Sequence, residues 1–148
     1  MTVNFSELKV ERISEDAQLP YYATDGSSGM DLISCNDYTL NVNSRILVQT
    51  GIKCEIPHGM EAQIRPRSGL ALKHGITVLN TPGTIDHDYS GEICVLLFNT
   101  SDSPFQIKKG DRVAQMVISP VVRLKINEVD SLTRETKRGE GGFGSTGS

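Results

Sequence analysis

The sequence predicts an all-β fold of the sandwich or barrel type, and three observations lead to this prediction. Apolar and alternating runs along the chain are short. Turn-forming residues separate these runs about every 8–12 residues, a spacing typical of sandwiches and barrels. Apolar side chains do not recur with the helical period over most of the chain. We therefore expect many short strands joined by tight turns.

The expected strands follow from these runs in chain order, and the turns follow from the Gly and Pro residues between them. The first run forms an edge strand, and the later runs supply the core of the sheets. The predicted strands are Leu8–Ile13, Met30–Ser34, Tyr38–Val42, Arg45–Gln49, Ile52–Ile56, Met60–Arg65, Ile76–Leu79, Glu92–Phe98, Phe105–Lys108, Arg112–Ser119 and Val121–Ile126.

Two local elements are more specific. Ile76–Asn80 and Thr84–Asp86 flank Pro82-Gly83, which predicts a β-hairpin with a tight turn. One short helix is expected over 69–73, with Ser68 as its N-cap and Gly75 at its end. The free N–H groups at the start of a helix suit a phosphate.

The C-terminal segment differs from the rest of the chain. Five of the ten residues from 139 to 148 are glycine, and Phe143 is the one large apolar side chain among them. Ordering such a segment carries a large entropic cost, so it does not hold a fixed structure alone. Two interpretations stay open: a free terminus, or a lid that closes on a planar anionic ligand. We predict a single domain over 1–132 and a flexible arm over 133–148.

Composition excludes several classes of function. Of the 148 residues, 15 are Lys or Arg and 18 are Asp or Glu, so the formal net charge is −3 and no basic excess exists to bind duplex nucleic acid. No apolar run approaches the roughly 20 residues of a membrane span, and no signal peptide is visible. Three widely spaced cysteines are expected to be reduced core residues, which indicates a cytoplasmic protein.

Five segments carry the functional signal: Gly29–Leu32, Pro66–Ala71, Leu79–Gly91, Gly110–Met116 and Arg138–Gly147. Their order, spacing and content resemble the five motifs of the trimeric deoxyuridine triphosphatases (dUTPases), and the resemblance runs from about Ala23 to Gly147. It implies a jelly-roll-like fold of the β-clip type. It also implies a homotrimer, with active sites between subunits, that hydrolyses dUTP to dUMP and pyrophosphate. This activity limits uracil incorporation into DNA and supplies dUMP for thymidylate synthesis.

The third segment is expected to bind the nucleoside and to hold the general base. By the resemblance, Asp86, and not Asp88, activates the water that attacks the α-phosphorus; a carboxylate suits this task because it can orient the water and accept its proton. An Asn80 amide and backbone groups match the donors and acceptors on the edge of uracil. The backbone groups expected to contact uracil are those of Gly83, Thr84 and Ile85. The resemblance also places Tyr89 under the sugar.

The second and fourth segments are expected to contact the phosphates. The resemblance places Arg67, Ser68 and the Gly69 backbone near the β-phosphate, and Gln115 on a strand beside them. A Ser68 hydroxyl can hydrogen-bond the bridging oxygen on which charge develops, and this role is compatible with capping the helix. We interpret Asp111 and Arg112 as turn and structural residues.

The fifth segment and Asp31 complete the expected site. Arg138 is expected to clamp the γ-phosphate and Phe143 to stack on uracil. The other arm residues expected to bind substrate are Gly144, Ser145 and Thr146. Mg²⁺ is implied as the cofactor, held mainly by substrate phosphates. Asp31 matches a carboxylate that contacts a metal-bound water, although a buried structural role for it stays open.

The segment from residue 133 to the end can span at most about 50 Å, which is enough to reach a neighbouring subunit. Three alternatives to the dUTPase interpretation remain. A deoxycytidine triphosphate deaminase shares the fold but lacks the Gly-rich fifth motif. A non-catalytic nucleotide-binding module would tolerate loss of Asp86 or of the arm. A purely structural β-sandwich would leave the five segments unexplained.

Overall fold

The computed structural model describes residues 7–147 and confirms the all-β prediction, with one short helix. In chain order, the elements are β1 (Lys9–Arg12), β2 (Tyr21–Tyr22), β3 (Met30–Ile33), β4 (Tyr38–Leu40), β5 (Arg45–Gln49), β6 (Ile52–Glu55), β7 (Met60–Arg65), α1 (Ser68–His74), β8 (Ile76–Val78), β9 (Gly83–Ile85), β10 (Cys94–Asn99), β11 (Phe105–Ile107) and β12 (Arg112–Pro120).

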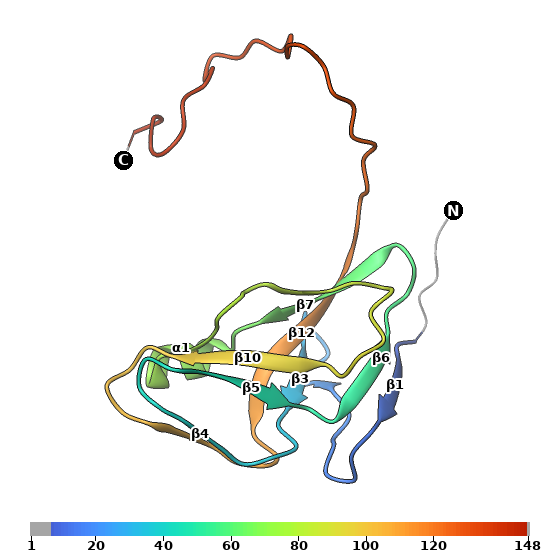
Figure 1. The fold of residues 1–148 in the computed structure, drawn as a ribbon, viewed down its shortest axis with the longest axis vertical. Coiled ribbons are helices and arrows are strands. Elements are labelled where there is room, and N and C mark those ends of the chain that lie inside the picture. The colour runs from blue at the N-terminus through green and yellow to red at the C-terminus, as the bar shows by residue number, and fades with distance from the viewer. Residues whose placement is uncertain (1–6, 148) are drawn as a thin grey trace.

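The strands form antiparallel sheets, and β12 is the central strand of the largest one. The largest sheet has the order β2-β3-β12-β7-β9, and a second has the order β5-β10-β8. Two-stranded ribbons, β1-β6 and β4-β11, complete the body (Figure 1). Since β12 pairs with both β3 and β7, it brings segments from both halves of the chain side by side.

A single apolar cluster between these sheets holds the body together. Residues from β3, β5, β7, β10 and β12 alternate into it, as strand geometry requires. Its fully buried members include Leu32, Val48, Ala62, Val95, Leu97 and Met116. Burying a Leu, Val or Met side chain contributes roughly 1.5–3 kcal/mol.

The cysteines are free, as predicted. Cys35 and Cys54 are buried and Cys94 is partly buried. Burial raises the pKa of the Cys54 thiol to about 11, because the thiolate would lose its hydration. Cys35 and Cys54 therefore serve as small core groups, as predicted, whereas Cys94 lies at the edge of the core.

The helix confirms one predicted end and corrects the other. Gly75 ends α1 in the left-handed conformation, with φ of 65°, and its N–H points back to the Ala71 and Leu70 carbonyls. Ser68 is not the N-cap, because the Arg67 carbonyl accepts the first helical hydrogen bond, from Ala71 at 3.0 Å. Arg67 gives the helix no side-chain cap, because a guanidinium carries only N–H donors and cannot accept a hydrogen bond from the first-turn N–H groups.

The predicted hairpin across Pro82-Gly83 is wrong. β8 pairs with β10, whereas β9 pairs with β7, so the two segments lie in different sheets. A Cβ on Gly83 would lie 3.2 Å from the Cβ of Ile64. The absence of a side chain at this position therefore lets the β9 backbone approach β7 closely.

The predicted strand over Val121–Ile126 is also wrong for the single chain. The backbone leaves the sheet after β12, and the N–H of Val121 donates to the Gly59 carbonyl at 2.9 Å. Val122, Leu124 and Ile126 are each at least 80% exposed. From there the chain runs away from the body as a long arm (Figure 1). The alternating apolar pattern is present, but no partner strand covers it in the described chain.

Other differences are small. The structure adds the two-residue strand β2, which the sequence pattern did not indicate, and β1 is an edge strand as predicted, paired with β6. Several strands end one or two residues earlier than expected. Within residues 7–147, no helix has the length and apolar character needed to cross a bilayer.

Candidate active site

The predicted phosphate-contacting residues meet at one end of the β3-β12-β7 sheet. Gln115 on β12 lies opposite Asp31 on β3 and opposite Arg65 on β7. The Gln115 amide donates to the Pro66 carbonyl at 3.0 Å, just before α1. A Cβ on Gly29 would lie 2.8 Å from the Gln115 amide oxygen, so glycine is the residue that leaves room for this side chain.

Asp31 is the buried acidic centre of this group, and its carboxylate is only 12% exposed. One of its oxygens lies 3.6 Å from Nε of Arg67, and the other lies 3.2 Å from Nη1 of Arg112. The structural role that the sequence left open for Asp31 is therefore present. Two guanidinium groups around one carboxylate leave an excess positive charge, which suits a polyanion.

The general-base candidate Asp86 lies at the other end of β7. It follows β9 directly, and its carbonyl accepts a hydrogen bond from the Tyr89 N–H at 3.1 Å. Asp86 and Asp88 therefore belong to a turn. Both carboxylates line an open cleft of about 530 Å³ with His58, Glu61 and other residues.

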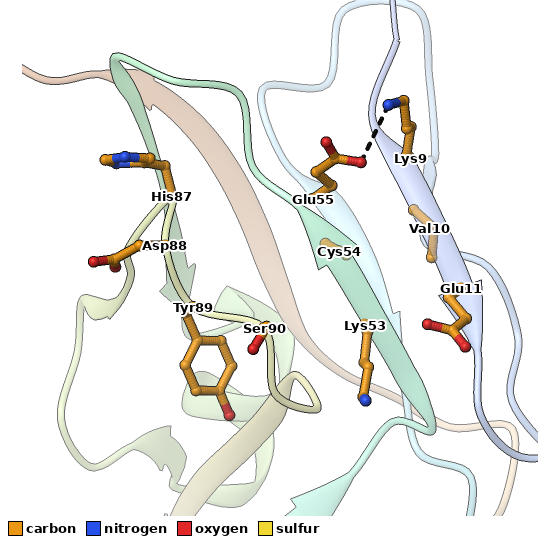
Figure 2. A pocket seen from close by; sticks show the side chains of 10 residues that line it. All are labelled: Lys9, Val10, Glu11, Lys53, Cys54, Glu55, His87, Asp88, Tyr89 and Ser90. Atoms are coloured by element: carbon orange, nitrogen blue, oxygen red, sulfur yellow. Dashed lines mark ion pairs between the residues drawn. The ribbon is translucent and has the colours of Figure 1, made fainter.

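Tyr89 is fixed by the loop that follows it. Its hydroxyl donates to the Glu92 carbonyl at 2.9 Å, and a Cβ on Gly91 would lie 2.4 Å from that hydroxyl oxygen. Figure 2 shows the groove between this loop and β6, with the His87 and Asp88 side chains directed away from β6. Lys9 and Glu55 form an ion pair of 3.2 Å on the far wall of the groove.

The arm residues form a third group. Arg138 donates from Nε to the Gly141 carbonyl at 2.7 Å, within the arm itself. Phe143 is fully exposed. Gly144, Ser145 and Thr146 are exposed in the same arm. The described chain therefore holds these predicted ligands away from the body.

The structure thus brings some predicted residues together and keeps others apart. Ile85 pairs with Ala62, and Gln115 pairs with Arg65. Continuing this register by one residue places Asp86 beside Glu61, which lies about 13 Å along β7 from Arg65. In addition, β9 and β12 flank β7 and are about 10 Å apart. One chain therefore does not place Asp86 beside the residues that are predicted to contact the phosphates.

Sequence reasoning missed two features of this region. Arg112 contacts both Asp31 and Arg67, and its expected structural role did not indicate these partners. His58 packs edge-on against His87, with ring centroids 4.9 Å apart. Neither contact has a signal in the sequence, because each joins residues that are distant along the chain.

Comparison with known proteins places this geometry in a family. The dUTPase family model matches residues 15–147. The chain is 57% identical over 142 residues to the deoxyuridine 5'-triphosphate nucleotidohydrolase of Hydrogenobaculum sp. strain Y04AAS1, covering 95% of this chain and 98% of that protein.

Solved structures show the same fold. The dUTPase of Staphylococcus bacteriophage 80alpha with dUpNHpp aligns with a TM-score of 0.90 and 25% identity, covering 97% of this chain and 99% of that one. A dUTPase variant from phage phi11 of S. aureus, described with a structural Mg(II) ion, aligns with a TM-score of 0.81 at 23% identity over 86% of this chain and 99% of that one.

Proposed function

Since the chain belongs to the dUTPase family, we propose that it hydrolyses dUTP to dUMP and pyrophosphate. The observation that carries this proposal is the family match over residues 15–147, which includes all five functional segments. The chain is thus a hydrolase of nucleotide metabolism.

The reaction needs a water aligned with the leaving pyrophosphate. We propose that Asp86 accepts a proton from this water as its oxygen bonds to the α-phosphorus and the bond to the bridging oxygen breaks. The placement of Asp86 in an open cleft supports the role, because substrate and water can both reach its carboxylate. The leaving pyrophosphate takes the electron pair of the broken bond.

Recognition of the nucleoside is assigned to the segment around β9. We propose that Asn80 and the backbone of Gly83, Thr84 and Ile85 bind uracil and that Tyr89 supports the deoxyribose. The firm anchoring of Tyr89 to the Glu92 carbonyl supports this role, because a fixed ring presents a defined surface to a sugar.

The phosphates are assigned to the positive group at the start of α1. We propose that Arg67, Ser68, Gly69 and Gln115 bind them, with Arg138 and Phe143 closing from the arm together with Gly144, Ser145 and Thr146. The excess of guanidinium over carboxylate around Asp31 supports this assignment. A closing arm would exclude water other than the nucleophile.

Magnesium is proposed as the cofactor. Residues 7–147 contain no group of three His, Cys, Asp or Glu side chains placed to hold a metal ion, so substrate phosphates would supply most ligands. The Asp31 carboxylate can still accept a hydrogen bond from a metal-bound water, because each oxygen has a second lone pair. When bound, Mg²⁺ would neutralise charge on the phosphates.

We propose that the working form is a homotrimer with sites shared between subunits. The separation of Asp86 from Gln115 within one chain supports this, since a triphosphate attacked beside Asp86 would not reach Gln115 of the same chain. The exposed apolar side chains of Val122, Leu124 and Ile126 also need a covering partner. The division into a domain over 1–132 and an arm over 133–148 stays a prediction, and so does a cytoplasmic location, which the free cysteines support.

Pyrophosphate release from dUTP with Mg²⁺, measured beside dCTP, dTTP and UTP, tests the activity. We expect rapid release from dUTP and at least about a hundredfold lower kcat/KM for the other three, because a site whose polar groups must pair with the substrate rejects poor matches strongly. Ammonia release from dCTP would instead indicate a deaminase. A folded protein that releases pyrophosphate from none of them would contradict the proposal.

A further inference from the structure

Arg112 makes two contacts with the proposed phosphate-binding region, one with Asp31 and one with Arg67. Its guanidinium donates from Nη1 to one oxygen of Asp31 at 3.2 Å, and its backbone carbonyl accepts a hydrogen bond from Nη1 of Arg67 at 2.9 Å. Arg67 in turn lies 3.6 Å from the other Asp31 oxygen. The three residues therefore form a closed ring of contacts.

A β-bulge makes this ring possible. Arg112 is three residues before Gln115, so a regular strand would place their side chains on opposite faces of the sheet. The register shifts between Arg112 and Ala114, and the shift pairs Arg112 with Ile33. Since Ile33 is two residues from Asp31, Arg112 is returned to the face that carries Asp31.

The ring also sets the charge that Arg67 presents. With Arg112 in place, two cations share one carboxylate, and the contact of Arg67 with Asp31 is long. Without the Arg112 guanidinium, Arg67 and Asp31 would form an isolated pair with no net charge, and Arg67 would be drawn onto the carboxylate. Arg67 and Arg112 both line an open cleft of about 350 Å³, so this charge is accessible to a ligand.

We propose that Arg112 is a positioning residue for triphosphate binding, which shares Asp31 with Arg67 and so keeps the Arg67 guanidinium free for the phosphates. This inference rests on the proposed function, since it concerns the same substrate. It extends that function by assigning a role in triphosphate binding to Arg112, the first residue of β12.

The test compares Arg112→Gln, Arg112→Lys and Arg45→Gln, the last as a control on an exposed arginine of β5. In Arg112→Gln, we expect KM for dUTP and Kd for its imido analogue dUpNHpp to rise about tenfold, the size expected for loss of a charge-assisted contact. Binding of dUMP, which lacks the β- and γ-phosphates, should change less than about twofold, and kcat less than about threefold. Arg112→Lys keeps the charge and should restore most of the affinity.

The Arg112 side chain is 44% exposed, so the variants are expected to fold, and thermal unfolding verifies this. Raising the salt concentration should reduce the difference in KM between wild type and Arg112→Gln. Unchanged dUpNHpp binding in Arg112→Gln, equal loss for dUMP and dUpNHpp, or an Arg112→Lys variant as weak as Arg112→Gln would each overturn the inference. Failure of the wild-type protein to hydrolyse dUTP would instead overturn the proposed function, and the two failures are thereby distinguished.

Discussion

Replacing Asp86 by asparagine is expected to lower kcat for dUTP by about 10²–10⁴, the range for loss of a general base. Asparagine is nearly isosteric and can still hydrogen-bond a water, but it cannot accept the proton. Asp86 is exposed and follows β9, so the substitution should leave the fold and the affinity for dUpNHpp nearly unchanged. Steady-state kinetics and a binding titration measure the two quantities separately.

The matched control is Asp88→Asn, because Asp88 lines the same cleft two residues further along the chain. We expect Asp88→Asn to retain kcat within about tenfold, since the substitution changes the local charge but leaves the assigned base, Asp86, in place. Similar losses in the two variants would contradict the assignment of Asp86 as the base. So would near-normal turnover in Asp86→Asn.

Removing the arm after Lys137 is expected to lower kcat/KM for dUTP by at least about a hundredfold. The truncation deletes Arg138 and Phe143, which we assign to the γ-phosphate and to uracil, and it deletes the lid that positions the substrate and excludes water. The exposed segment Val122–Ile126, which we assign to subunit contacts, stays in place. Light scattering should therefore still give three times the mass of one chain.

Two arginines of the arm provide the control. Arg138→Gln should reproduce much of the loss in kcat/KM, whereas Arg134→Gln, four residues earlier in the same exposed segment, should remain close to wild type. A truncated protein with full activity would contradict the lid assignment. Equal effects of the two substitutions would show that only the overall charge of the arm matters.

Much of the fold could be predicted because strands and turns leave local signals. The bounds of β5 and β7 agree with prediction at both ends; Gly59 and Pro66 flank β7 directly, and Gly51 follows β5 after one residue. Gly75 ended α1 as expected for a residue that adopts positive φ without strain. These features depend on residues within a few positions of one another.

The features that could not be predicted depend on partners distant in the sequence. Pro82-Gly83 is a turn signal, but it does not reveal that β8 pairs with β10 and β9 with β7. Ser68 is a good cap by residue type, yet the path of the chain places Arg67 at the cap position. The alternating run Val121–Ile126 is compatible with a strand, but pairing requires another strand beside it.

The candidate site shows the same division. The resemblance to the dUTPase motifs selected Asp31, Asp86 and Gln115, and the structure places each on or beside the sheet that contains β12 and β7. The spacing did not show that Asp86 lies far from the other two within one chain. The double contact of Arg112 arises from a β-bulge, for which the sequence offered no marker.

The central claim is that one working site takes Asp86 and the arm from different chains. Its most direct test is to coexpress two inactive proteins, Asp86→Asn with its arm intact and the chain truncated after Lys137 with Asp86 intact, and to assay the mixed trimers for dUTP hydrolysis. With random assembly in equal amounts, about one site in four should receive both an intact Asp86 and an intact arm. We predict recovery of about a quarter of wild-type kcat. Activity no higher than that of the two separate variants, in trimers shown to contain both chains, would contradict the account.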